Sequence, residues 1–278
     1  MNFKLLRKIY PHIEAQNKNI SWRRITDDEL LKIAGEPQKL CNCFSMSTRD
    51  ALINSSRGRE ILKKRIWVDK NATTDSPAYK IILSPNGRDE VYRVSPLDYY
   101  TKYAGITATY NEIPKGSGNY KHSESNNLNT AIDIAITKMI SKHPKEKPWY
   151  VRLFTSPISK KCEFNHPSKA FEWFTGIKPV AIGEDGLFNN LNKNKQETLK
   201  QLDELSGTDS KNYSFILLTG FRTDKRLENW HCYPIKRIGY SSLDILNKRT
   251  EDGLRFTGAE VTKLFKALVG IDWRKVEK

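Results

Sequence analysis

The chain has 278 residues, and 38% of them are hydrophobic, which excludes a peptide scaffold and intrinsic disorder and predicts a folded globular protein. Its formal net charge is +15, but the basic residues are spread in short clusters, which is typical of a solvated surface and not of a dedicated nucleic-acid stripe. Four cysteines do not make a disulfide framework in so long a chain, and no stretch approaches the ~20 apolar residues of a membrane helix, so we expect a reducing compartment and no membrane span.

Helix signals dominate the start of the chain. Residues 26–29 (Thr-Asp-Asp-Glu) form a capping-box pattern before an apolar run, which predicts a helix over 26–34. The stretch 43–66 contains few helix breakers and predicts two helical segments joined near residues 55–58. Cys43 is therefore expected at or near a helix start.

The middle of the chain alternates strand and helix patterns. Two β-prone runs around an Asn-Gly pair predict a β-hairpin over 78–94. Residues 128–141 are apolar on most helical faces and predict a central helix. A short aromatic helix face over 171–174 is followed by Thr175-Gly176, where a boundary between two lobes fits.

The last part of the chain combines two helices with a sheet. An exposed amphipathic helix is predicted over 189–206, and the tail 257–269 is predicted to be a helix that begins with a second capping box. Between these helices, three apolar runs separated by polar turns predict an antiparallel sheet. The runs are 214–221, 231–238 and 242–247.

The hairpin formed by the last two runs carries two polar residues of interest. A short loop centred on Gly239 pairs Tyr233 with Ile245 and places His231 directly opposite Asn247. A cysteine hydrolase needs a His to take the thiol proton, an Asn or Asp to orient the imidazole, and a Cys at a helix N-terminus where the dipole favours the thiolate. The sequence therefore predicts Cys43 as nucleophile, His231 as general base and Asn247 as the orienting residue.

Three segments resemble the calpain-like branch of papain-fold cysteine peptidases. Residues 37–44 (Pro-Gln-Lys-Leu-Cys-Asn-Cys-Phe) resemble the nucleophile segment Gln-Gly-x-x-Gly-Asp-Cys-Trp/Tyr of that family. Residues 231–233 (His-Cys-Tyr) resemble its His-Ala-Tyr, and 243–247 resemble the strand that ends in its Asn-Pro-Trp. The order Cys, His, Asn is also the order of the family.

The resemblance implies an α+β fold of the papain-like, two-lobed kind, with the active-site cleft between a helical lobe and an antiparallel sheet lobe. The expected division is a lead-in over 1–37, a helical lobe over 38–175 with Cys43, and a sheet-rich lobe over 176–278 with His231 and Asn247. Gln38 matches the oxyanion-hole Gln of the family, although it lies five residues before Cys43 where the family has six. No cofactor is expected, because the loops are rich in Lys and Asn and lack the acidic residues of the family's calcium sites.

The implied activity is hydrolysis of a protein substrate through a thioester at the cysteine. Glutamine deamidation and acyl transfer use the same triad and stay open. A basic catalytic unit without a signal peptide is similar to bacterial effectors or toxins, so we expect the substrate to be a host or target-cell protein and delivery to follow a non-classical secretion route.

Two alternatives belong to other classes of function. A metal site would draw its ligands from three short segments that each carry two Cys or His residues, although the spacings of these residues match no recognised zinc pattern. A basic nucleic-acid-binding protein without catalysis would stack bases on exposed aromatic side chains. The candidate metal ligands are Cys41, Cys43, Cys162, His166, His231 and Cys232. The candidate stacking residues are Trp149, Tyr150, Trp173 and Phe174.

Overall fold

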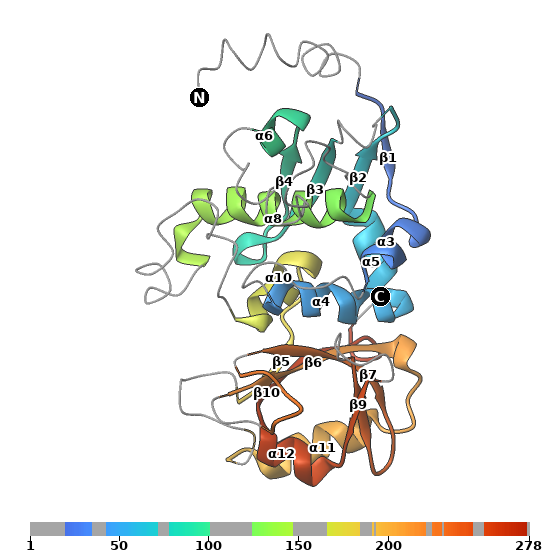
Figure 1. Cartoon of the computed structure of the whole chain (residues 1–278), viewed down its shortest axis with the longest axis vertical. Helices are drawn as coiled ribbons and strands as arrows, with labels where there is room; N and C mark the ends of the chain where they lie inside the picture. The colour runs from blue at the N-terminus through green and yellow to red at the C-terminus, as the bar shows by residue number, and fades with distance from the viewer. Residues whose placement is uncertain are drawn as a thin grey trace, which may run out of the picture. The chain divides into compact units, whose positions relative to one another are not determined.

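The protein is a mixed α+β structure with two antiparallel sheets, which confirms the expected fold class at that level (Figure 1). The chain divides into two compact units, and each is described by itself. Unit 1 comprises residues 1–33 and 63–163, and unit 2 comprises residues 34–62 and 164–278. The computed structural model describes residues 20–34, 43–71, 78–100, 124–146, 166–183, 191, 193–220, 224–229, 231–246 and 253–276. Within these ranges no helix has the length and apolar character needed to span a bilayer.

Unit 1 is built on a four-stranded antiparallel sheet with the order β1-β2-β3-β4. Its strands are β1 (Trp22–Arg24), β2 (Ile66–Asp69), β3 (Tyr79–Leu83) and β4 (Glu90–Val94). The predicted hairpin is confirmed: β3 and β4 pair around a short 3₁₀ turn, Pro85–Gly87. Asn86 and Gly87 take φ values of 53° and 71° in this turn, a left-handed conformation that Asn and Gly adopt at low cost.

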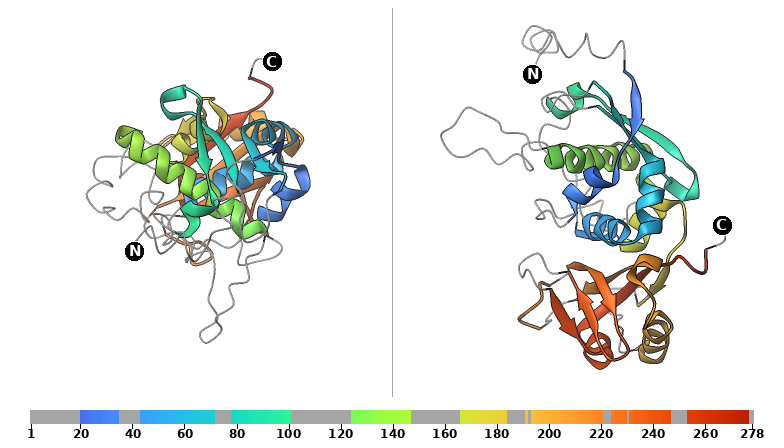
Figure 2. Two further views of the ribbon diagram at one scale, coloured as in Figure 1. Left: turned by 90° about the horizontal axis from the view of Figure 1, so that it is seen from above. Right: turned by 90° about the vertical axis from the view of Figure 1, so that its right-hand side faces the viewer.

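Helices cover one face of this sheet. The predicted central helix is α8 (Glu124–Lys142), which packs on β3 and β4 (Figure 2). The helix predicted over 26–34 is α3 (Asp27–Ile33), and it packs on α8. Its capping box is present, because the Glu29 backbone N–H donates to the Thr26 hydroxyl and the Thr26 backbone N–H donates to the Glu29 carboxylate. The described part of unit 1 also contains α6 (Pro96–Tyr100) and a 3₁₀ turn, Pro144–Glu146.

Unit 2 contains a six-stranded antiparallel sheet with the order β5-β10-β6-β7-β8-β9. Its strands are β5 (Val180–Ile182), β10 (Phe265–Asp272), β6 (Tyr213–Thr219), β7 (Cys232–Ile238), β8 (Leu243–Ile245) and β9 (Leu254–Phe256). Strands β6, β7 and β8 are the three apolar runs from which the sequence predicted an antiparallel sheet, and that prediction is confirmed.

Helices cover both faces of the unit 2 sheet. On one face, α4 (Cys43–Asn54) packs on β6, β7 and α10 (Pro167–Thr175), while on the other face α11 (Lys195–Leu205) packs with α12 (Gly258–Leu264) (Figure 1). The two helical segments predicted after residue 43 are α4 and α5 (Ser56–Arg65), and the unit boundary falls within α5. A 3₁₀ turn, Ser210–Asn212, leads into β6.

One predicted helix is partly wrong. The tail 257–269 begins as expected, with the Thr257–Glu260 capping box of α12, but the helix ends at Leu264 and the chain continues as β10. Every residue of β10 is buried, because the strand lies inside the sheet between β5 and β6 with helices on both faces. A run that is apolar at every position has no two-residue alternation, so periodicity alone does not distinguish it from a buried helix.

The predicted register of the β7–β8 hairpin is also wrong. Ile245 pairs with Ile235 and not with Tyr233, and Leu243 pairs with Ile238. The turn is closed by the Gly239 N–H, which donates to the Ser242 carbonyl at 2.7 Å, so its centre lies beyond Gly239. An irregularity between Ile235 and Arg237 adds a further shift, which a sequence pattern does not reveal.

The units group the chain differently from the predicted lobes. Segment 34–62, which includes the helix that begins at Cys43, belongs with residues 164–278 because α4 packs on β6 and β7. The division into lobes at residues 175 and 176 stays a prediction. A consequence for the site is that Cys43 and His231 belong to the same unit.

Candidate active site

Cys43 is the first residue of α4, as the sequence predicted, and its side chain is half-buried. The helix is fixed against the sheet one turn later, where the Ser47 hydroxyl donates a hydrogen bond to the Cys232 carbonyl at 2.6 Å. On another side, the ring of Phe44 meets the ring of Trp173 of α10 edge-on, with 6.1 Å between centroids. The start of α4 is therefore held both by strand β7 and by α10.

The surroundings of Cys43 lower the pKa of its thiol below the ordinary value. The largest cause is a hydrogen bond from the Cys232 side chain, and the backbone N–H groups of Cys232 and Phe44 act in the same direction. Burial and the nearby Glu228 carboxylate raise the pKa and partly offset this effect. The Phe44 N–H lies in the first turn of a helix, where N–H groups have no partner within the helix and favour an anion at that end. The environment thus favours the thiolate, which is the nucleophilic form.

His231 immediately precedes β7 and is held by its backbone. Its N–H donates to the Thr219 hydroxyl at 2.8 Å, and its carbonyl accepts from the Thr219 N–H at 2.9 Å. The imidazole is half-buried and meets the ring of Tyr233 at a centroid distance of 4.8 Å. The end of β6 therefore fixes the position of the His231 backbone at the start of β7.

Glu228 is a candidate site residue that sequence reasoning missed. Its Oε2 lies 3.5 Å from Nδ1 of His231. The turn that carries it is fixed at two points: the Thr219 hydroxyl donates to the Glu228 carbonyl at 2.6 Å, and the Glu228 N–H donates to the Tyr233 hydroxyl at 2.7 Å. A carboxylate three residues before a His has no special meaning in a sequence, because only this fold of the turn brings the two side chains together.

The structure brings together part of the predicted set. The thiol of Cys43 contacts Cys232, the residue that follows His231, and the nearby Glu228 carboxylate raises the pKa of this thiol through its charge. The imidazole of His231 lies with Tyr233 and Glu228. Gln38 and Asn247 lie outside the residues that the structure describes, so their roles stay predictions. The predicted register that places Asn247 directly opposite His231 is wrong, so the role of Asn247 depends on the family resemblance alone.

The structure also bears on the two alternatives, a metal site and base stacking on aromatic side chains. Within the described ranges, no cluster of three or more His, Cys, Asp or Glu side chains is arranged to hold a metal ion. Trp173 and Phe174 are buried, so neither offers a stacking surface for bases, while Trp149 and Tyr150 lie outside the described residues. A cavity of about 520 Å³ lies between α11 and the β7–β8 turn, and its lining does not include Cys43, Glu228 or His231.

Comparison of the sequence with models of known protein families gives no match, and comparison with curated proteins gives none. The assignment of a function therefore depends on the chemistry of the site itself.

Proposed function

We propose that the protein is a cysteine peptidase-like hydrolase of the papain-like, two-lobed kind, with Cys43 as nucleophile and His231 as general base. The observation that carries the proposal is the environment of Cys43: a thiol at the first residue of a helix, with a lowered pKa, beside the residue that follows a half-buried His. A buried structural cysteine in apolar surroundings has a raised pKa and is inert. The environment of Cys43 acts in the opposite direction.

In the proposed mechanism the Cys43 thiolate attacks a substrate carbonyl carbon, and the carbonyl π electrons move onto oxygen. The tetrahedral intermediate collapses to a thioester as the C–N bond breaks, and His231 donates a proton to the leaving amine. His231 then removes a proton from water, which attacks the thioester, and the thiolate leaves. Gln38 and backbone N–H groups at the start of α4 are the proposed oxyanion donors.

Glu228 adds a positioning role that the sequence did not suggest. Its carboxylate lies on the Nδ1 side of His231, where an acceptor selects the tautomer and stabilises the imidazolium. In this proposal Glu228 orients the ring at Nδ1, and Asn247 keeps an orienting role only through the family resemblance, because the predicted register that places it opposite His231 is wrong.

The proposed substrate is a protein, as the resemblance implies, and a host or target-cell protein if the chain is an effector or toxin. Deamidation of glutamine and acyl transfer remain alternatives, because all three reactions share the thioester at Cys43.

The proposal is tested by exposing the purified protein to a library of proteome-derived peptides and analysing the products by mass spectrometry. New peptide termini identify hydrolysis, and conversion of glutamine to glutamate without new termini identifies deamidation. We expect Cys43→Ser and His231→Ala to lower the rate by ~10³ or more, and Glu228→Gln and Asn247→Ala to leave a reduced remainder. Gln38→Ala is expected to lower kcat by ~10² to 10³.

Cys162→Ser is the matched control, because it removes a thiol that has no role in the proposal. It should keep the wild-type product pattern and rate. Product formation by Cys43→Ser at the wild-type rate would contradict the proposal, and a fully active His231→Ala would remove His231 as the base.

A further inference from the structure

One face of the unit 1 sheet presents cations and an indole in a row that crosses all four strands. Arg24 pairs with Trp67, Trp67 with Lys80, and Lys80 with Arg93. Side chains of residues in register project to the same side of a sheet, so these four groups are neighbours on one face. Arg24 and Arg93 are exposed, and Trp67 and Lys80 are half-buried.

The opposite face of the same sheet is the one that packs in the core of unit 1. The residues that alternate with the row, such as Val68, Ile81 and Tyr92, are buried. Helix α8 packs on β3 and β4, and Figure 2 shows it lying along one face of the sheet. Val91, two residues before Arg93 and on the same side as the row, is 57% exposed. The row is thus part of a solvent-facing surface.

A second indole joins the row. Trp22 lies two residues before Arg24 on β1, so it projects to the same side. The Lys80 ammonium nitrogen lies 4.8 Å from the ring centroid of Trp22 and 5.5 Å from that of Trp67. These cation–π contacts hold both indoles and the ammonium in one patch. The patch therefore combines side chains from three strands: Trp22 from β1, Trp67 from β2 and Lys80 from β3.

Among the residues that the structure describes, the three cations of this row have no carboxylate as an ion-pair partner. Lys80 and Arg93 are directly opposite each other, an arrangement of like charges that destabilises a strand pair. No side-chain ion pair joins Arg24, Lys80 or Arg93 to an acidic residue among those the structure describes. Asp69 does lie on this face, but it is buried and its Oδ1 accepts hydrogen bonds from the backbone N–H groups of Ser21 and Asn71.

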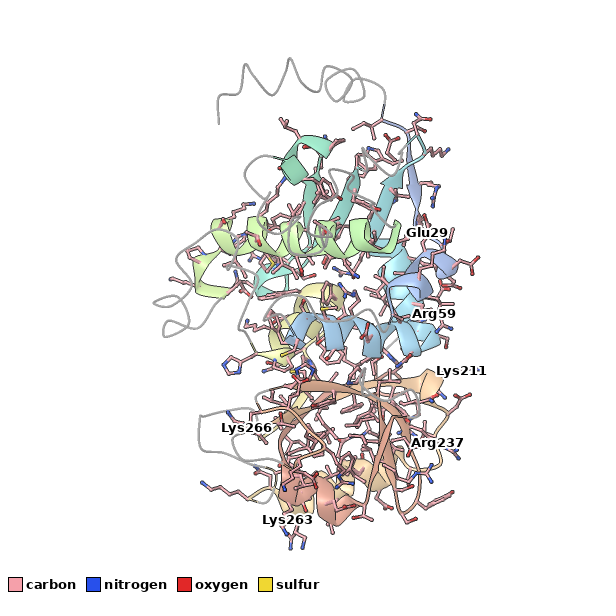
Figure 3. All side chains as sticks on the ribbon, in the orientation of Figure 1. Glu29, Arg59, Lys211, Arg237, Lys263 and Lys266 are labelled. Atoms are coloured by element: carbon pink, nitrogen blue, oxygen red, sulfur yellow. The ribbon has the colours of Figure 1, made fainter. Side chains whose placement is uncertain are left out.

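Arg23, the residue before Arg24, differs from the cations of the row because it has an acidic partner. It points to the other side of β1 and forms an ion pair with Glu29 at 2.6 Å (Figure 3 labels Glu29). Arg23 thus has an acidic partner within the chain, and an external anion would relieve the repulsion within the row.

We propose that this face binds single-stranded nucleic acid, with backbone phosphates at Arg24, Lys80 and Arg93 and bases stacked on Trp22 and Trp67. Single strands alternate an anionic phosphate with an aromatic base, and proteins bind them by combining cations with aromatic platforms on an open sheet or groove. The row offers both kinds of group within one strand spacing of each other. An acidic protein segment would match the charges alone and leave the two indoles without a partner of their own kind.

This inference goes beyond the proposed hydrolase activity and does not depend on the thiol chemistry. Its test is fluorescence anisotropy with a labelled oligothymidylate of about 12 nucleotides, titrated with the full chain at several salt concentrations. The test variant is Lys80→Gln/Arg93→Gln. The matched control is Lys236→Gln/Arg237→Gln, which removes the same charge from an exposed pair on β7 (Figure 3 labels Arg237).

The test pair should weaken binding at least tenfold and lower the slope of log K against log salt by about 1.4, since each phosphate contact on a single strand contributes about 0.7. Trp67→Leu should weaken binding about tenfold without changing that slope, and Trp22→Leu should act alike. The control pair should stay within about twofold of the wild type.

Three outcomes would overturn the proposal. One is the absence of binding at about 50 mM salt. Another is an equal loss of affinity in the test and control pairs, which would assign binding to net charge alone. The third is an Asp- and Glu-rich peptide that binds with the affinity of the oligothymidylate and is unaffected by Trp67→Leu, which would assign the face to an acidic protein segment.

Discussion

The two sheets of the protein differ in how many of their faces are covered. In unit 1, strands β3 and β4 alternate between buried residues and residues that reach solvent, as in β4, where exposed Val91 and Arg93 flank buried Tyr92. In unit 2, β10 is buried at every position and β6 at nearly every position, because helices pack on both faces. The number of covered faces determines what each sheet can contribute to function. The unit 1 sheet offers a surface, whereas the unit 2 sheet offers a rigid support that holds the start of α4 and the turn before β7.

The largest effect is expected at Gly270, which lies in β10 of the doubly covered sheet. A Cβ atom there would collide with the Ser214 carbonyl oxygen and the Phe215 side chain on β6, where backbone leaves little room to move. Gly270→Ala should therefore lower the free energy of unfolding by about 3 kcal/mol. Val91→Ala on the solvent-facing side of β4 should change it by no more than about 0.5 kcal/mol. Urea unfolding of both variants gives the comparison, and equal losses would contradict it.

A smaller difference in unfolding free energy is expected between substitutions of two tryptophans, Trp273 in unit 2 and Trp67 in unit 1. The indole N–H of Trp273 donates to the hydroxyls of Ser55 and Ser214 at 3.0 and 3.1 Å, in a buried polar cluster. Trp273→Phe removes that donor and should cost about 1 to 2 kcal/mol of unfolding free energy. Trp67→Phe in unit 1 keeps an aromatic ring beside Lys80 and should cost less than about 0.5 kcal/mol. A Trp273→Phe protein as stable as Trp67→Phe would show that the cluster contributes nothing.

The smallest effect is expected at Glu90, at the edge of the unit 1 sheet. Hydrogen bonds from Lys142 and Tyr92, with a further contribution from His143, lower the pKa of Glu90 from 4.5 to about 2. Because the pKa in the folded state lies below the ordinary value, the stabilisation is fully present above about pH 4.5 and is lost as the pH falls toward 2.

Glu90→Gln should therefore lower stability at neutral pH by no more than about 1 kcal/mol, since the ion pair is near the surface. The difference from the wild type should shrink as the pH falls below 4.5 and vanish near pH 2. Urea unfolding at several pH values measures it. A gap that stays constant over this range would mean that the Glu90 charge does not contribute.

The sequence predicts the elements whose signals are local. The Asn-Gly pair at 86–87 predicts the β3–β4 hairpin, and the capping boxes predict the starts of α3 and α12. Strand β10 is missed because residues buried on both faces carry no alternation. The β7–β8 register is missed because the irregularity after Ile235 depends on packing between strands.

The candidate site divides in the same way. The position of Cys43 at a helix start is predictable, because it follows from the helix pattern that begins there. The contact of Cys43 with Cys232 and the approach of Glu228 to His231 are not, because they depend on how α4 docks on β7 and how one turn folds back. Residues distant in sequence meet through tertiary packing, which no local pattern encodes.

The most direct test of the central claim, that Cys43 is the activated thiol, is alkylation with limiting iodoacetamide at neutral pH, followed by mass spectrometric mapping of all four cysteines. Cys43 should be labelled first, and Cys232→Ala should slow its labelling, because the Cys232 side chain is the main cause of the lowered pKa of Cys43. Labelling of Cys41, Cys162 or Cys232 at the rate of Cys43 or faster would contradict the account.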